Sequence, residues 1–280
     1  MPGTPLTGRP AVITGAASGI GRALAQRLSA LGSPVAIADV DEAGLERTAD
    51  SLRSPVLTRV LDVRDAADQR AFAAEVREWL PEPLAAVFNN AGVAVAGTVL
   101  DGEPADDDWL HEINFKGVVH GTRAFLPLLA EQDSGAVVNT SSVFGLAGIP
   151  AQSAYCAAKF GVRGYTEALR HELRGTGVRA VTVHPGGINT DIVRNARFSQ
   201  DPQGLASTQD ELAERFAKMA LTSPEKAARV IHQGVERGKA RILVGPDAVV
   251  FDVVTRLAPT HYWDLLTGAM SGMRRLSRRC

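Results

Sequence analysis

The sequence predicts an α/β protein built on one doubly wound, mostly parallel sheet with helices on both faces. Short apolar runs alternate along the chain with amphipathic segments of helical period. The apolar runs are continuous rather than alternating with polar residues, which is typical of strands covered on both faces. These two patterns favour a three-layer sandwich with a seven-stranded sheet in a single domain over residues 1–245, followed by a C-terminal extension over 246–280.

The elements of this sandwich follow one another in order. Strands are expected over 10–14, 34–38, 56–61, 84–88, 136–139, 178–183 and 241–244. Helices are expected over 20–31, 42–52, 66–80, 106–131, 154–174 and 224–237. Residues 190–222 are largely polar with one helical patch over 211–221, which is typical of a substrate loop. Right-handed crossovers place the carboxyl ends of all parallel strands at one edge, where ligands of such sheets bind.

Composition and charge exclude several classes of protein. The chain has 280 residues, 45% hydrophobic and 22% charged, which fits a folded globular protein. Its 30 Lys+Arg and 31 Asp+Glu give a net charge of −1, which argues against nucleic-acid binding. Cys156 and Cys280 have no metal-ligand spacing, and the N-terminus has no apolar leader, so we expect a cytoplasmic protein without a metal. Four arginines near the C-terminus are interpreted as a solvated tail: Arg274, Arg275, Arg278 and Arg279.

A glycine-rich turn follows the first strand and opens the first helix. Gly15, Gly19 and Gly21 have the spacing G-x-x-x-G-x-G. Glycines allow the backbone to approach a pyrophosphate, whose charge is stabilised by the N-terminus of the following helix. A tight turn can also need glycine for structural reasons alone, so it is the position between strand and helix that indicates dinucleotide binding.

Asp39 ends the second strand, eighteen positions after Gly21. A carboxylate at this position can bind both ribose hydroxyls of an adenosine and would repel a 2′-phosphate. No cation stands at positions 16–18 or directly after Asp39. The sequence therefore favours NAD over NADP, although an N-cap for the next helix is an alternative role for Asp39.

Small or polar residues also follow the other strands. They are Asp62 and Val63, then Asn89 to Gly92, then Ser141 and Ser142, and finally His184 to Gly187. Any one of these strand ends could be a simple turn, but together along one sheet edge they indicate a site. His184 is interpreted as structural because Pro185 follows it.

Tyr155 and Lys159 are four residues apart at the start of a helix, so both lie on one helix face. A neighbouring ammonium stabilises a phenolate, which predicts a Tyr155 pKa below its usual value of about 10. Ser142, thirteen residues before Tyr155, can hold a substrate oxygen while Tyr155 moves a proton. A Tyr-x-x-x-Lys pair alone could be a surface pair, but the glycine turn and the strand-end serine make it a candidate catalytic pair.

In this combination and order of motifs, residues 8–245 resemble a classical short-chain dehydrogenase/reductase. The resemblance implies a Rossmann-like fold and a catalytic set of Asn114, Ser142, Tyr155 and Lys159, with Asn114 holding a water against the lysine. It implies cofactor contacts from Gly15, Ser18, Gly19, Ile20, Gly21, Asp39, Asp62, Val63, Asn90, Ala91, Gly92, Tyr155, Lys159, Pro185, Gly186, Ile188 and Thr190. It also implies a homodimer or homotetramer.

The function expected from this resemblance is NAD-dependent interconversion of a secondary alcohol and a ketone. A dinucleotide sensor or scaffold that uses the fold without chemistry is the alternative. Apolar residues after Ser142 and Gly92 and within the loop from Thr190 favour an apolar substrate, unless they pack only against one another. We expect the extension to cover the pocket or join subunits, rather than contact a membrane.

Overall fold

The computed structural model describes residues 3–198, 211, 214, 217 and 220–268. The strands of its main sheet are β1 (Ala11–Thr14), β2 (Val35–Asp39), β3 (Val56–Val60), β4 (Ala86–Asn89), β6 (Gly135–Thr140), β7 (Val178–Pro185) and β9 (Arg241–Val244). The helices are α1 (Gly19–Ala30), α2 (Glu42–Asp50), α3 (Ala66–Trp79), α4 (Pro104–His111), α5 (Gly117–Glu131), α6 (Ser153–Glu172), α8 (Pro224–Glu236) and α9 (Pro246–Leu257).

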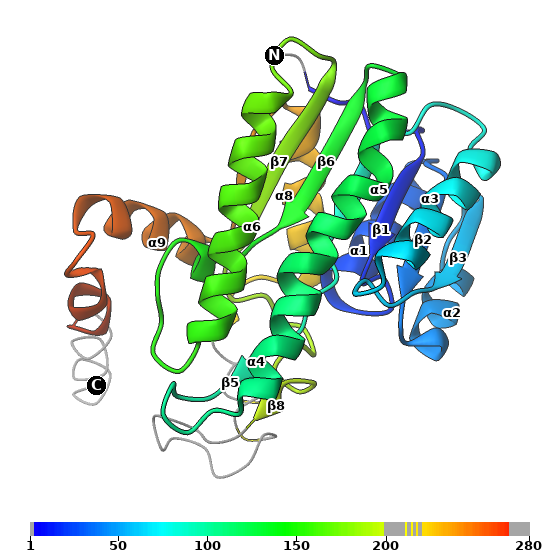
Figure 1. Cartoon of the computed structure of the whole chain (residues 1–280). Coiled ribbons are helices and arrows are strands. Elements are labelled where there is room, and N and C mark those ends of the chain that lie inside the picture. Colours follow the sequence, from blue (N-terminus) through cyan, green and yellow to red (C-terminus); the bar gives the residue numbers. More distant parts are fainter. Residues whose placement is uncertain (1–2, 199–210, 212–213, 215–216, 218–219, 269–280) are drawn as a thin grey trace, which may run out of the picture.

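The seven strands form one parallel sheet in the order β3-β2-β1-β4-β6-β7-β9 (Figure 1). This confirms the doubly wound α/β fold. The strand order reverses between β1 and β4, because the chain builds outward to β3 before it returns to the other side of β1. In open parallel sheets such a switch point leaves a crevice at the carboxyl edge, where ligands bind.

Alternate residues of the strands supply two separate cores. Ile13 of β1 faces the core formed with α1, α2 and α8, whereas its neighbour Val12 faces the core formed with α3 and α5. In the second core Phe72 and Phe125 meet edge to face at 5.7 Å between ring centroids. The central strands are buried on both sides, which is why their sequences are continuously apolar.

Three features of the chain differ from the sequence-based expectation. The helix expected over 106–131 consists of α4, a π-helical turn at Glu112–Lys116, and α5. Strands β5 (Val95–Ala96) and β8 (Arg197–Phe198), whose paired residues are 102 positions apart in the sequence, form a small second sheet that no local sequence pattern predicted. The extension begins with α9, which lies beside the sandwich rather than in either helix layer (Figure 1). In the described part of the chain, no helix has the length and apolarity needed to cross a membrane.

Candidate active site

The glycine turn packs against the segments that follow β4 and β7 at the same sheet edge. A Cβ on Gly15, whose φ is +69°, would lie 2.7 Å from the Ala91 Cα. A Cβ on Gly21 would lie 2.0 Å from the Gly15 carbonyl oxygen, and one on Gly19 would lie 3.1 Å from the Thr190 Cγ2. Because Cβ atoms on Gly15 and Gly21 would meet backbone atoms, only glycine fits at these two positions, and the turn predicted to bind the cofactor is held close to Ala91 and Thr190.

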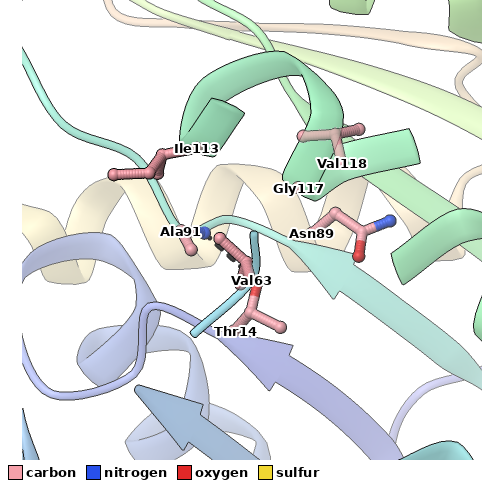
Figure 2. Close-up of a pocket in the computed structure, with 7 residues that line it drawn as sticks. All are labelled: Thr14, Val63, Asn89, Ala91, Ile113, Gly117 and Val118. Atoms are coloured by element: carbon pink, nitrogen blue, oxygen red, sulfur yellow. Dashed lines mark hydrogen bonds between the residues drawn. The ribbon is translucent and has the colours of Figure 1, made fainter. Parts of the chain in front are cut away.

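The segment that follows β4 is tied to the glycine turn through Thr14. The Thr14 Oγ1 accepts hydrogen bonds from the Asn90 and Ala91 amides at 3.1 and 3.2 Å, and the Asn90 Nδ2 donates to the Thr14 carbonyl at 3.2 Å. Figure 2 shows Thr14, Ala91 and Val63 around one small cavity, so the ends of β1, β3 and β4 meet here. The predicted cofactor residues from these three strands are therefore neighbours.

Asp39 lies beneath the glycine turn. Its Oδ2 accepts a hydrogen bond from the Ala17 amide at 2.9 Å, and its Oδ1 accepts one from the Asp41 amide at 3.1 Å. The N-cap of α2 is Asp41, whose carboxylate accepts from the Gly44 amide. The alternative that Asp39 serves as this N-cap is therefore wrong. Asp62, the other predicted carboxylate, pairs with Arg64, whose guanidinium lowers the pKa of Asp62.

The π-helical turn points Asn114 into the protein. The Asn114 side chain is fully buried, accepts a hydrogen bond from the Val93 amide at 2.8 Å and donates to the Val93 carbonyl at 2.8 Å. A Cβ on Gly92 would lie 3.1 Å from the Asn114 Oδ1 and 3.4 Å from the Lys159 Nζ. Asn114 and Lys159 thus flank Gly92 from two different helices, as expected for members of one site.

Tyr155 and Lys159 lie in the first turns of α6 beside Ser142. The Lys159 Nζ lies 5.6 Å from the centroid of the Tyr155 ring and donates a hydrogen bond to the Thr140 carbonyl at 3.1 Å. The Ser142 Oγ accepts from the Phe144 amide at 3.1 Å, and the Phe144 ring meets the Tyr155 ring edge to face at 5.9 Å. The structure therefore brings the three predicted catalytic side chains together.

Burial dominates the protonation of this pair. Burial raises the pKa of Tyr155 to about 12, against a hydrogen bond with Ser142 that lowers it. Burial also lowers the pKa of Lys159 to about 8. The expected lowering of the Tyr155 pKa is not seen here, because both side chains lose the solvent that stabilises their charged forms.

The segment after β7 closes the predicted site. Ile188 is buried and bridges to Thr222, and the Asn189 amide donates to the Thr222 carbonyl at 3.0 Å. The Gly186 amide donates to the Val244 carbonyl at 2.9 Å, which fastens the turn after Pro185 to β9. Most of the expected substrate loop, residues 199–210 and parts of 211–219, lies outside the described residues.

The apolar segment after Ser142 is less open than expected. Val143, Leu146 and Ala147 are buried, so packing explains them, whereas Phe144 and Ile149 are only partly buried. Of the apolar residues expected after Gly92, Val95 is buried in a cluster with Leu110. An apolar wall is therefore retained chiefly beside Tyr155.

Sequence reasoning missed three contacts to this region. The His184 Nδ1 lies 3.1 Å from the Ser142 carbonyl oxygen, and burial lowers the His184 pKa to about 4, so a neutral ring supports the serine's backbone. From the extension, Asp247 reaches the Gly187 amide and the Tyr262 hydroxyl exchanges two hydrogen bonds of 2.9 Å with the Gly148 backbone. Only the strand-end position of His184 gave a local signal.

Comparison with known proteins identifies the family that shares this arrangement. The family model for short chain dehydrogenases matches residues 9–201. The chain is a short-chain dehydrogenase. Among curated relatives, SadH of Mycobacterium tuberculosis, named as an oxidoreductase, is 43% identical over 271 residues, covering 94% of this chain and 96% of SadH.

Two further proteins, one curated relative and one solved structure, are similar to this short-chain dehydrogenase. Levodione reductase of Leifsonia aquatica is 36% identical over 236 residues, covering 82% of this chain and 88% of the relative. A short chain dehydrogenase/reductase from Burkholderia phymatum, solved in complex with NAD, superposes with a TM-score of 0.81 at 31% identity, covering 90% of this chain and 94% of that one. These similarities identify the present chain as an oxidoreductase of this family.

Proposed function

We propose that this short-chain dehydrogenase interconverts a secondary alcohol and a ketone with NAD, and that its substrate is largely apolar. The observation that carries the proposal is the position of the buried Lys159 and the partly buried Tyr155 on one face of α6, beside Ser142 and Asn114. NAD would supply a hydride acceptor at its nicotinamide ring. The glycine cradle at Gly15 and Gly21 and the backbone-anchored carboxylate of Asp39 fit a dinucleotide in the crevice at the switch point.

In this proposal the chain's own residues move one proton. The Ser142 hydroxyl holds the substrate oxygen, and the Tyr155 hydroxyl gives that oxygen a proton or takes one from it. With its pKa raised to about 12, Tyr155 is a phenol at neutral pH, which suits proton donation to a ketone. Lys159 would hold the nicotinamide ribose, and Asn114 would hold the water that passes the proton onward.

Asp39 carries the proposed preference for NAD. Its carboxylate is fixed by two backbone amides at the end of β2, where a 2′-phosphate would meet a negative charge. The neighbouring Arg22 guanidinium is engaged with the Ala17 carbonyl and with Thr48 rather than directed at Asp39. A homo-oligomer and a cytoplasmic location stay predictions.

A paired fluorescence titration with NADH and NADPH tests this proposal. We expect NADH to bind at least about tenfold more tightly than NADPH, and the Asp39→Ala variant to narrow that ratio. A preference for NADPH would contradict the role of Asp39 but keep the reaction. Binding of neither nucleotide would contradict the proposed function itself.

A further inference from the structure

The first turn of α9 contacts the site through one carboxylate. The Asp247 Oδ2 accepts a hydrogen bond of 2.6 Å from the Gly187 amide, sixty residues earlier in the chain. A Cβ on Gly186 would lie 2.1 Å from the same oxygen. Any side chain at position 186 would displace the carboxylate, so the Gly186–Gly187 pair is the feature that admits Asp247.

The other carboxylate oxygen of Asp247 is buried close to Gly245 and Thr222. The Asp247 Oδ1 and the Thr222 Oγ1 are both buried, and neither has a hydrogen-bond partner within the described ranges. A Cβ on Gly245, whose φ is +103°, would lie 2.4 Å from the Asp247 Oδ1 and 3.2 Å from the Thr222 Oγ1. Burying a carboxylate oxygen without a partner costs free energy.

Within the described part of the chain, the other hydrogen bonds of the turn that Asp247 holds are bonds between backbone groups. They run to β9 and to Thr222, through the Gly186 amide to the Val244 carbonyl and the Asn189 amide to the Thr222 carbonyl. These bonds fix the two ends of the turn. Asp247 fixes the peptide between them, and a bond to a charged acceptor is about twice as strong as a neutral one.

We propose that Asp247 is a positioning residue for the cofactor. Its carboxylate holds the Pro185–Gly187 turn in the conformation that receives the nicotinamide half of NAD, although it touches no reacting atom. This inference rests on the proposed function, which assigns the turn to the nicotinamide. It gives the first turn of the C-terminal extension a part in cofactor binding.

Calorimetric titration with NADH and with ADP-ribose tests the role, because ADP-ribose lacks the nicotinamide. For Asp247→Ala we expect the NADH Kd to rise about tenfold while the ADP-ribose Kd stays unchanged. Asp247→Asn keeps one acceptor oxygen without the charge and should raise the NADH Kd by only about threefold.

Asp252→Asn is the matched control on the same helix. Asp252 pairs with Arg241 and Arg256, so this variant loses ion pairs of α9 without touching the turn. We expect it to lower the melting temperature and to leave both Kd values unchanged. An equal loss for NADH and ADP-ribose in Asp247→Ala, or no loss for either, would overturn the inference.

Two further outcomes distinguish a failure of this inference from a failure of the proposed function on which it rests. If Asp247→Ala fails to fold, Asp247→Asn is measured in its place. Hydrogen exchange of the Gly187 amide is then the second measurement. Faster exchange of this amide with an unchanged NADH Kd would overturn the cofactor role of Asp247. Failure of the unaltered protein to bind NADH would instead overturn the proposed function, and this inference with it.

Discussion

The two halves of the candidate site are built on different physical principles. The nucleotide half, around Gly15, Gly21 and Asp39, is made by close approach of backbone to backbone and by a carboxylate fixed on amides. The reaction half depends on Tyr155 and Lys159, whose pKa values are displaced by burial. The comparison teaches that the proposed nucleotide recognition depends on backbone shape and one fixed charge, whereas the proposed reactivity depends on excluded solvent.

The largest expected effect comes from removing a single oxygen atom, which should impair turnover and leave nucleotide binding intact. Tyr155→Phe removes the hydroxyl that moves the proton and keeps the ring that packs against Phe144. We expect turnover to fall by about a thousandfold, while the NADH Kd changes by less than about twofold. Steady-state kinetics and a binding titration on the same preparation measure both. Unimpaired turnover would remove Tyr155 from the mechanism.

In the nucleotide half, by contrast, a steric clash should cause the loss of stability and of nucleotide binding. Gly21→Ala would place a Cβ 2.0 Å from the Gly15 carbonyl oxygen, a backbone atom that cannot move aside cheaply. We expect a loss of about 3 kcal/mol in the free energy of unfolding, together with weaker nucleotide binding. Denaturant unfolding and NADH titration measure the two effects.

Gly164 of α6 supplies the matched control for that substitution. A Cβ there meets nothing within 4 Å, so Gly164→Ala should stabilise the helix by about 0.5–1 kcal/mol. Equal effects of the two substitutions would show that the tight packing of the turn is unimportant.

The last expected effect is a gain in stability. Lys159→Met removes an ammonium whose burial costs about 3 kcal/mol at neutral pH, and it also removes a hydrogen bond to Thr140 worth about 1 kcal/mol. We therefore expect the free energy of unfolding to rise by about 2 kcal/mol while activity is lost.

The stability gained by Lys159→Met should depend on pH. The Lys159 pKa falls from 10.5 when unfolded to about 8 when folded, so between these values the unfolded chain binds more protons and stability rises with pH. The advantage of Lys159→Met should therefore be full below pH 8 and vanish above about pH 10.5. A constant advantage across this range, in urea melts at pH 7 and pH 10.5, would contradict the buried-ammonium account.

Much of the fold could be predicted because its signals are local. The central strands β1 and β4 are almost continuous apolar runs, and the glycine turn lies directly between β1 and α1. The helical spacing of Tyr155 and Lys159 likewise placed them on one face of α6 before any tertiary contact was known. The π-helical turn at Asn114 was missed, because a single inserted residue leaves the apolar periodicity almost unchanged.

The sequence by itself predicted the succession of the main-sheet strands and most of the helices, the sheet edge that holds the candidate site and most of the candidate residues there. Only the tertiary structure decided which pKa values move and in which direction, since burial of Tyr155 and Lys159 arises from segments far apart in the chain. It also decided that Asp247 reaches Gly187, a contact across sixty residues. Local patterns report neighbours along the chain, whereas desolvation and long-range hydrogen bonds exist only once the sheet has brought its strand ends together.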